Sequence, residues 1–502
     1  MTSVATSRLD GPRARDGSAA RTLRNYIGGE WREAASVETL DTMDPATGDL
    51  LARVPLSGAA EVDAAARAAR EAFPGWRATS PLARTRALFA FRDALDAQRD
   101  ELARLVTIDM GKTLDDALGE VGRGIESVET ACGGPSLLMG EGLEGVANGV
   151  DVELVRQPVG VVAAITPFNF PAMIPLWFLP FALAAGNTFV LKPSERDPLA
   201  SERIVELVDA IEAIPPGVVN LVHGARESVD GLLDHPEVDA VSFVGSAATA
   251  GHVYRRAAEH GKRVQALGGA KNAMVVMPDA DPPSTAAGVA ASAFGAAGQR
   301  CLAGSVAVLV GSPEEQDRSR DLIVEAAREL RNGSGLDPET DVCPLVAPEA
   351  RERVEGEIDR AVEDGAELVL DGRTGGGPAG TELGATVLDH AEPGIRLLDE
   401  ELFGPVLALT RVPELDAALD RVNASRYGNA AVIFTTSGAA AREFKSGVEA
   451  GMVGVNVGVA APVAWFPFAG WKGSFNGDLH ANGADAMRFY TRTKVVTSRW
   501  PS

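Results

Sequence analysis

The amino-acid sequence predicts an α/β protein with two doubly wound domains and a small additional β element. Strands and helices alternate along most of the 502 residues, and the strands after residue 151 are apolar throughout. Continuous apolar runs fit parallel strands that helices cover on both faces. The chain also exceeds the size of one compact core, which favours two major domains.

The N-terminal part contains a tail of biased composition, followed by residues that mark where helices begin and end. Residues 1–24 are rich in Arg, Ser, Ala and Gly and lack an apolar run, which predicts a disordered tail rather than a secretory signal. Pro74 is expected to stop a first helix, and Ser80 followed by Pro81 is a strong start signal for the next one.

Apolar strands then follow in two blocks. The first block predicts a sheet of the dinucleotide-binding type, and the second predicts another α/β domain. The expected strands are 159–165, 187–191, 218–222 and 240–244 in the first block, and 274–276, 305–310, 368–370, 406–409 and 431–434 in the second. Residues 493–498 alternate as a last strand, which we expect to pair with another subunit or with an outlying hairpin.

The composition disfavours several classes of protein. A formal net charge of −23 argues against nucleic acid as a partner. Three sparse cysteines indicate a reducing compartment, which we take to be the cytoplasm, and six histidines without ligand spacing to them predict no metal site. Five prolines interrupt the uncharged stretch 157–191, so we expect buried protein there and no membrane span.

A glycine pattern in the second block matches the dinucleotide fingerprint without its context. Gly375, Gly377 and Gly380 satisfy G-x-G-x-x-G, but Pro378 lies inside the pattern and the residues that follow are not helical. The fingerprint requires a helix to begin at that point, so a surface hairpin is the better interpretation.

Two other motifs follow apolar strands of the first block and are better candidates for a cofactor site. In F-V-G-S at 243–246, Gly245 permits a tight turn, and Ser246 with the first helical amides can receive a pyrophosphate. In K-P-S-E, Lys192 and Glu195 can both hydrogen-bond ribose hydroxyls. The glutamate would repel a 2′-phosphate, which favours NAD over NADP. Either motif alone also occurs in ordinary turns and solvated loops.

Cys301, in G-Q-R-C, is the strongest candidate for covalent chemistry. Small residues precede it and leave the thiol approachable, and the adjacent Arg300 is expected to lower the pKa of that thiol. A lone cysteine is more often an apolar filler of the core, which is our interpretation of Cys132 and Cys343. The polar neighbours of Cys301 favour a nucleophile instead.

Together these motifs resemble the aldehyde dehydrogenase superfamily over nearly the whole chain. The matching segments are N-Y-I-G-G-E-W at 25–31, P-F-N-F-P at 167–171, K-P-S-E at 192–195, F-V-G-S at 243–246, G-Q-R-C at 298–301, E-E-L-F-G-P at 400–405, P-F-A-G-W-K at 467–472 and T-K-V-V-T-S-R-W at 493–500. The resemblance implies a homodimer or homotetramer. The implied parts are an NAD-binding domain of residues 25–140 and 158–265, a catalytic domain of 266–454, and an oligomerisation element of 141–157 and 485–502.

The resemblance also implies a role for each matching residue. Cys301 would attack an aldehyde and carry a thioester, while the Asn169 side-chain amide and the Cys301 backbone amide hold the oxyanion. Glu401 would hold the nicotinamide ribose, with Phe403 packed nearby. The full set of implied cofactor-binding residues is Thr166, Phe168, Lys192, Glu195, Gly245, Ser246, Glu401 and Phe403.

At one position the sequence differs from most of the superfamily and is similar to a particular branch of it. Ala266 stands where hydrolytic members carry the glutamate that activates water, and alanine cannot take a proton. This change resembles the CoA-acylating methylmalonate-semialdehyde dehydrogenase branch, in which coenzyme A receives the acyl group and carbon dioxide is released. The arginines that contact the substrate carboxylate in that branch match Arg123 and Arg300.

The implied reaction is NAD-dependent oxidation of methylmalonate or malonate semialdehyde to propionyl-CoA or acetyl-CoA. NAD is the expected cofactor, and the partners are a small acidic semialdehyde and coenzyme A. Two alternatives stay open: a hydrolytic NAD(P)-dependent enzyme that releases a free acid, and a non-catalytic scaffold. Without the resemblance, Arg123 would more simply be a surface arginine of a helix, and Arg300 could act only on the thiolate. Ala273 and the stretch 458–466 differ from other members of the branch and leave the semialdehyde open.

Overall fold

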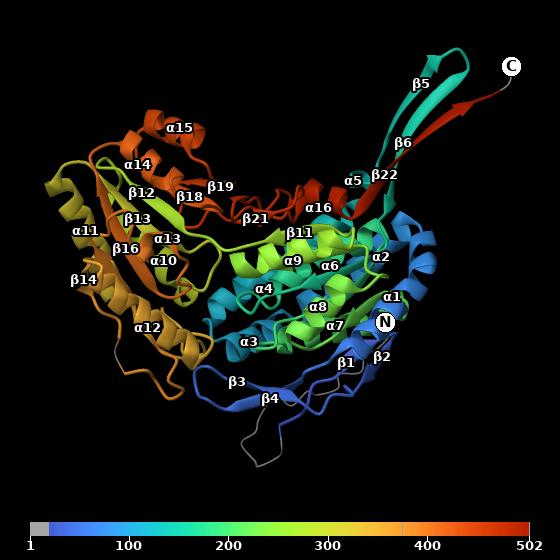
Figure 1. Cartoon of the computed structure of the whole chain (residues 1–502), viewed down its shortest axis with the longest axis horizontal. Coiled ribbons are helices and arrows are strands. Elements are labelled where there is room, and N and C mark those ends of the chain that lie inside the picture. The colour runs from blue at the N-terminus through green and yellow to red at the C-terminus, as the bar shows by residue number, and fades with distance from the viewer. Residues whose placement is uncertain (1–19, 374, 501–502) are drawn as a thin grey trace.

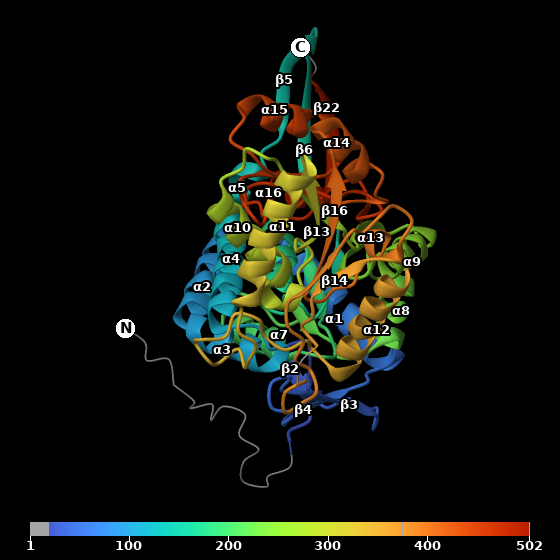
Figure 2. The same cartoon turned by 90° about the vertical axis from the view of Figure 1, so that its left-hand side faces the viewer.

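The computed structural model describes residues 20–373 and 375–500, and it confirms the predicted α/β architecture. Two large sheets with helices on their faces lie beside each other, and a narrow three-stranded arm projects from the molecule (Figures 1 and 2). Residues 1–19 of the predicted tail lie outside the described part of the chain. Order begins before residue 25, because Leu23 is buried and its amide donates to the carbonyl of Arg53.

The first sheet has eight strands, of which the central five are parallel. Its order is β2 (Glu30–Arg32), β1 (Asn25–Ile27), β9 (Val219–Leu221), β8 (Thr188–Lys192), β7 (Val161–Ile165), β10 (Ala240–Val244), β11 (Arg263–Leu267) and β21 (Phe475–Asn476). The parallel strands are buried except at Arg263, as their continuous apolar sequences predict. Their carboxyl ends meet at one edge, which is where open α/β sheets bind ligands.

Helices cover both faces of the first sheet (Figure 1). One face packs against α1 (Ala59–Ala78), α8 (Arg226–Asp234) and α9 (Ala247–Glu259). The other packs against a larger layer made of α2 (Pro81–Ala97), α3 (Arg99–Met110), α4 (Leu114–Cys132), α5 (Gly134–Leu137), α6 (Met173–Ala185), α7 (Leu199–Asp209) and α16 (Gly483–Phe489). Within the described residues, no helix combines the length and apolarity needed to cross a bilayer.

The predicted helix stop at Pro74 is wrong, because α1 continues through this proline. Proline removes one backbone hydrogen bond from a helix. Beyond it, however, Trp76 is buried and its Nε1 donates to the carbonyl of Leu183 at 3.2 Å, so tertiary packing offsets the lost bond. The start signal is confirmed: α2 begins at Pro81, and the Ser80 hydroxyl caps it.

The second sheet has seven strands, of which six are parallel. Its order is β14 (Glu367–Leu370), β15 (Thr386–Asp389), β16 (Val406–Val412), β13 (Gly304–Val310), β12 (Asn272–Val276), β18 (Ala430–Phe434) and β19 (Met452–Val455). The helices of this half are α10 (Pro282–Phe294), η1 (Gly295–Gly298), α11 (Pro313–Arg328), α12 (Pro348–Glu363), α13 (Arg396–Asp399), α14 (Leu415–Asn423) and α15 (Gly438–Gly447). The chain passes from the first sheet to the second between β11 and β12, so Ala266 belongs to the first.

The glycine pattern of the second block lies in the connection between β14 and β15. These strands pair antiparallel, and the described residues between them form no helix. The interpretation of Gly375, Gly377 and Gly380 as part of a hairpin, rather than a dinucleotide fingerprint, is confirmed.

The projecting arm consists of β5 (Glu141–Ala147), β6 (Val150–Pro158) and β22 (Thr491–Arg499). Strand β22 pairs with β6 over its whole length, which confirms that the terminal strand joins an outlying hairpin. Two further small sheets pair β3 (Thr39–Met43) with β4 (Leu50–Pro55), and β17 (Tyr427–Gly428) with β20 (Trp471–Lys472). Large apolar side chains of the arm are exposed, among them Leu143 at 65% and Val495 at 62%.

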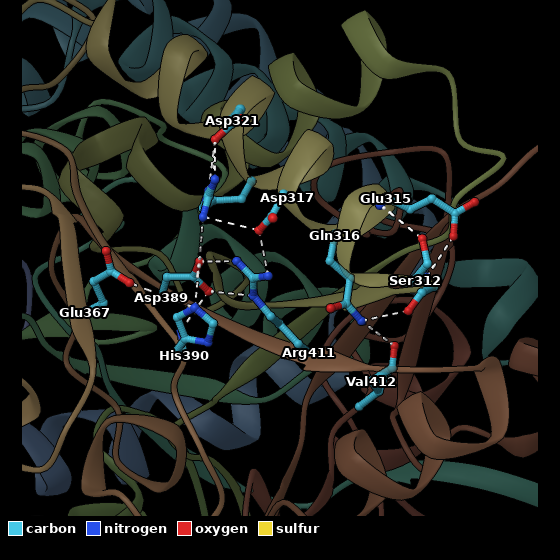
Figure 3. A network of polar contacts seen from close by, with 12 residues as sticks. Ser312, Glu315, Gln316, Asp317, Asp321, Glu367, Asp389, His390, Arg411 and Val412 are labelled. Carbon is cyan, nitrogen blue, oxygen red and sulfur yellow. Dashed lines mark hydrogen bonds and ion pairs between the residues drawn. The ribbon is translucent and has the colours of Figure 1, made fainter.

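A charged network ties helix α11 to the second sheet (Figure 3). Arg411 of β16 makes two hydrogen bonds to Asp389 of β15, at 2.5 and 3.2 Å, and a third to Asp317 of α11 at 2.8 Å. The Asp389 side chain is fully buried, whereas Arg411 is 13% exposed. A buried carboxylate is costly without a partner, so the arginine stabilises this corner of the sheet.

We expect Arg411→Met to lower the free energy of unfolding by about 3 kcal/mol, because it removes the two hydrogen bonds from the guanidinium to the buried Asp389 carboxylate. The carboxylate keeps the His390 backbone amide at 2.7 Å, and Arg320 is more distant, at 3.7 Å. Urea unfolding followed by circular dichroism measures the loss. The matched control is Arg331→Met, which removes an exposed ion pair with Glu339 and should cost less than about 1 kcal/mol. Equal losses in both variants would contradict the importance of the buried carboxylate.

Candidate active site

Two clefts open near the carboxyl edge of the first sheet, and the segment 166–173 lies between them. One cleft, of about 650 Å³, is lined by the ends of β7, β8 and β10 and by α8 and α9, and we call it the strand-end cleft. The other, of about 310 Å³, is lined by α4, by α6, by Cys301 and by residues between 459 and 468, and we call it the thiol pocket.

The strand-end cleft has the features of a dinucleotide site. A Cβ at Gly245 would lie 2.5 Å from the Phe243 ring, so only glycine fits this close turn. A helix begins at this turn, as predicted, and Ser246 caps it: its hydroxyl accepts from the amide of Thr249 at the start of α9. The buried Thr166 hydroxyl has no partner among the described residues, which leaves it free to meet a ligand atom. These residues fit a pyrophosphate at a helix start.

Lys192 is held more tightly than the sequence indicated. Its buried ammonium donates to the carbonyls of Pro193 and Gly224, both at 2.6 Å, and to Glu195 at 3.1 Å. These bonds use all three N–H groups, so Lys192 supports the loop that presents Glu195 to the cleft. Burial is the largest single influence and raises the pKa of Glu195, but the charges of Lys192 and Arg196 and the hydrogen bonds to the carboxylate together outweigh it, so the pKa is lowered overall. The carboxylate is therefore ionised, as the repulsion of a 2′-phosphate requires.

The remaining cofactor candidates come from both halves of the molecule. Phe168 follows β7, and its ring meets the ring of Phe403 edge to face, with centroids 5.7 Å apart. Phe403 has a φ of +54°, an uncommon backbone conformation for a bulky residue. Glu401, two residues earlier, accepts from the amide of Ala270 at 3.0 Å. The loop after α13 thus contacts the segments that follow β7 and β11, although none of its residues lines the strand-end cleft.

Cys301 lines the thiol pocket, just before β13. Two side-chain amides fix its backbone, since Nδ2 of Asn272 and Nδ2 of Asn429 donate to its carbonyl at 2.9 and 2.8 Å. Both asparagines escaped the sequence analysis. The available signal was a polar residue at the start of an otherwise apolar strand, at β12 and just before β18.

The prediction that Arg300 lowers the thiol pKa is wrong. Burial, and then the charge of Glu401, raise the pKa of Cys301 to about 12, and Lys112 is the cation that acts in the opposite direction. The Arg300 guanidinium instead donates to Asp116 at 2.7 Å, so a carboxylate already matches its charge. In the ligand-free protein the Cys301 thiol is therefore protonated at neutral pH.

Both predicted substrate arginines line the thiol pocket together with Cys301. Arg123 projects from α4, is 47% exposed and donates to Glu126 at 2.7 Å. Arg300 is 18% exposed beside Asp116. A guanidinium has five N–H donors, so one carboxylate partner leaves donors free for a second anion.

Asn169 lies in the bend between β7 and α6 and is buried. Its backbone carbonyl accepts from the ammonium of Lys112 at 2.8 Å, while its side-chain amide meets no acceptor among the described residues. Lys112 also pairs with Glu120 at 2.6 Å, and both residues line the thiol pocket. The sequence analysis assigned these two residues no role, although Lys112 is one of only seven lysines in the chain.

No carboxylate reaches the thiol pocket from β11. Ala266 is fully buried in the sheet, where it pairs with Phe243 of β10 and Asn476 of β21. Residues 265–270 contain no acidic side chain. The carboxylate whose charge acts on Cys301 belongs to Glu401.

Glu401 couples this site to pH. Burial raises its pKa from 4.5 to about 7, although the Ala270 amide and the Lys271 charge act against that rise. Because the pKa is higher in the folded protein than in the unfolded chain, the protonated group stabilises the fold below about pH 4.5. That stabilisation is lost as the pH rises through about 7.

We expect Glu401→Gln to raise the free energy of unfolding of the ligand-free protein by up to about 3 kcal/mol at pH 8 and to have little effect at pH 4.5. The amide keeps an oxygen for the Ala270 N–H but carries no buried charge. Thermal unfolding at the two pH values measures the difference. Glu400→Gln, which removes an exposed partner of Arg426, is the control and should show no such pH dependence. A gain that is the same at both pH values would contradict this account.

Residues 31–496 match the model of the aldehyde dehydrogenase family. The chain belongs to the aldehyde dehydrogenase family. Among curated relatives of this aldehyde dehydrogenase, malonate-semialdehyde dehydrogenase 1 of Geobacillus kaustophilus (strain HTA426) is 50% identical over 480 residues, which cover 95% of this chain and 98% of the relative. Malonate-semialdehyde dehydrogenase 2 of the same organism is 48% identical and covers 96% of this chain and all of the relative.

Solved structures give the same relationship. A chain from Sinorhizobium meliloti 1021, described as a methylmalonate-semialdehyde dehydrogenase complexed with NAD, superposes with a TM-score of 0.94 at 43% identity and covers 97% of this aldehyde dehydrogenase and 99% of that chain. Methylmalonate-semialdehyde dehydrogenase from Oceanimonas doudoroffii superposes with a TM-score of 0.93 at 44% identity, covering 96% and 99% respectively. The fold expected from the sequence motifs is thereby confirmed.

Proposed function

We propose that this aldehyde dehydrogenase oxidises malonate or methylmalonate semialdehyde with NAD and transfers the acyl group to coenzyme A. One observation carries the proposal: the nucleophile candidate Cys301 shares a pocket with two arginines, while β11 supplies no carboxylate to activate water. The names of the relatives, malonate- and methylmalonate-semialdehyde dehydrogenase, support the same substrates.

The proposed chemistry begins with the aldehyde in the thiol pocket. Arg123 and Arg300 bind the substrate carboxylate, which directs the carbonyl carbon toward Cys301. The Cys301 thiol loses its proton to solvent as its sulfur attacks that carbon, and the Asn169 amide with the Cys301 backbone N–H stabilises the oxyanion. NAD, when bound, accepts the hydride. It would be held by Gly245, Ser246, Glu195 and Glu401, with Thr166 and the two phenylalanine rings beside it and Lys192 as support for Glu195.

The second half of the reaction depends on the absence of a carboxylate on β11 that could activate water. After oxidation the acyl group is a thioester of Cys301, and slow hydrolysis leaves it for the thiol of coenzyme A. The substrate carboxylate leaves as carbon dioxide, and a proton replaces it on the adjacent carbon. The products are acetyl-CoA from malonate semialdehyde and propionyl-CoA from methylmalonate semialdehyde.

The decisive experiment compares malonate semialdehyde, methylmalonate semialdehyde and propanal as substrates, each with and without coenzyme A. We expect one equivalent of NADH per active site without coenzyme A and continuous turnover with it, and acyl-CoA as the product. Steady NADH formation without coenzyme A, with a free acid as product, would instead establish the hydrolytic alternative, for which the charge of Glu401 near the sulfur is the favouring observation.

The same assay tests the substrate class. Arg123→Ala should raise KM for the two acidic semialdehydes by about 10–100-fold, the value of a lost charge-assisted hydrogen bond, and leave KM for propanal nearly unchanged. Arg92→Ala removes another helix arginine paired with a glutamate, Glu129, outside the thiol pocket and should alter neither KM.

We also infer that the arm formed by β5, β6 and β22 pairs subunits in a homodimer or homotetramer, because its exposed apolar side chains would gain cover there. Three free cysteines fit a cytoplasmic location.

A further inference from the structure

The bend that carries Asn169 needs contacts from other parts of the chain to hold its conformation. It runs from the end of β7 at Ile165 to the start of α6 at Met173, without regular secondary structure. No side chain of its own sequence caps α6. The first backbone amides of a helix need acceptors. The Phe170 carbonyl of the bend accepts from Ile174 at 3.2 Å, so the amides of Ala172 and Met173 must find acceptors elsewhere in the fold.

Lys112 holds the first part of the bend. It lies between α3 and α4, and its side chain is 1% exposed. The ammonium donates to Glu120 at 2.6 Å and to the Asn169 carbonyl at 2.8 Å, and it lies 4.0 Å from the centroid of the Phe170 ring. Two acceptors and an aromatic ring thus hold the ammonium in place, which suits a group that fixes a backbone.

Glu120 holds the other end of the bend. Its Oε2 receives Lys112, and its Oε1 accepts from the amides of Ala172 and Met173 at 2.8 and 3.0 Å. Glu120 comes from α4 and caps α6 across the helix–helix contact, with its side chain fully buried. One ion pair thus grips the bend on both sides of Phe170.

We propose that the buried Lys112–Glu120 pair is a positioning device for the Asn169 amide. The inference rests on the proposed function, in which that amide meets the oxyanion. A donor of this kind acts only when it lies about 3 Å from the developing charge, and a shift of about 1 Å can cost as much as 10²-fold in rate. By fixing the carbonyl of Asn169 and the amides three and four residues later, the pair holds the backbone from which the donor projects.

The test is a double-mutant cycle between Lys112→Met and Asn169→Ala, read as the rate of the first NADH burst without coenzyme A. We expect Lys112→Met alone to slow the burst about 10–100-fold at unchanged KM, and to slow it no further once Asn169 is already alanine. Lys262→Met is the matched control, because this buried lysine also donates to two carbonyls, those of His235 and Val238, but outside the thiol pocket. It should act equally with and without Asn169.

Lys112→Met leaves Glu120 buried without its partner, so the variant can fail to fold. In that case Lys112→Met/Glu120→Gln, which removes both charges and keeps an acceptor for the two amides, takes its place in the cycle. The same loss from Lys112→Met in both Asn169 backgrounds would overturn the positioning role. Because the burst precedes acyl transfer, this outcome is distinct from a failure of coenzyme A dependence, which would overturn the proposed function alone.

Discussion

Cys301→Ala is expected to abolish NADH formation, with a loss of about 10⁴–10⁶-fold, because Cys301 is the proposed nucleophile and the one cysteine among the described residues that lines the thiol pocket. The structure places this thiol in a pocket with two arginines and fixes its backbone carbonyl with Asn272 and Asn429. The variant should still fold, since alanine is smaller than cysteine and the site is only partly buried. The rate of NADH formation, followed by its absorbance at saturating aldehyde, NAD and coenzyme A, measures the loss.

The other cysteines are matched controls for this prediction. Cys132 and Cys343 are both free and buried, and burial raises the pKa of their thiols to about 11 and about 12. Neither lines the strand-end cleft or the thiol pocket. Cys132→Ala and Cys343→Ala should therefore keep the wild-type rate, and loss of activity in either of them with survival in Cys301→Ala would remove Cys301 as the nucleophile.

Asn169→Ala should lower kcat by about 10²–10³-fold with little change in KM, as expected for a donor that acts only on the oxyanion. Asn169→Asp has the same size but places a carboxylate at that charge, so its loss should be greater still. Steady-state kinetics with malonate semialdehyde and coenzyme A separate the two constants. A rise in KM at constant kcat would show instead that Asn169 contacts the substrate in its ground state.

Asn220→Ala distinguishes this effect from the general cost of losing a buried asparagine. Asn220 lies on β9, and its side chain bonds to Gly28 and Gly217, away from both clefts. The variant should lower the melting temperature and keep kcat. If it reduced kcat as strongly as Asn169→Ala, the rate loss would reflect damage to the first sheet.

The strands were the most predictable part of the fold because their burial is written into local sequence. Residues 240–244 were predicted as a strand and form β10 with the same bounds. The stop at Pro74 failed for the opposite reason: the contact of Trp76 with Leu183 spans more than a hundred residues and leaves no local trace. Backbone preference gave way there to tertiary packing.

In the candidate site, too, the local sequence predicted some features, whereas others depend on contacts between distant residues. Motifs located Cys301, and the structure brings Arg123 into the same pocket. They could not show that Arg300 turns toward Asp116, because adjacency in sequence does not fix where a side chain points. The clamp of Lys112 and Glu120 on the bend depends on contacts more than fifty residues apart, which only the folded chain reveals.

The segment 166–173 separates the strand-end cleft from the thiol pocket, and each cleft opens on its own side of the segment. Its first residues face the strand-end cleft, whereas Phe170 and Met173 face the thiol pocket. In the proposed reaction, NADH would leave from the strand-end cleft while the acyl group stays on Cys301 in the thiol pocket. Separate openings favour a ping-pong mechanism, in which NADH leaves before coenzyme A enters. Double-reciprocal plots of the steady-state velocities would then give parallel lines.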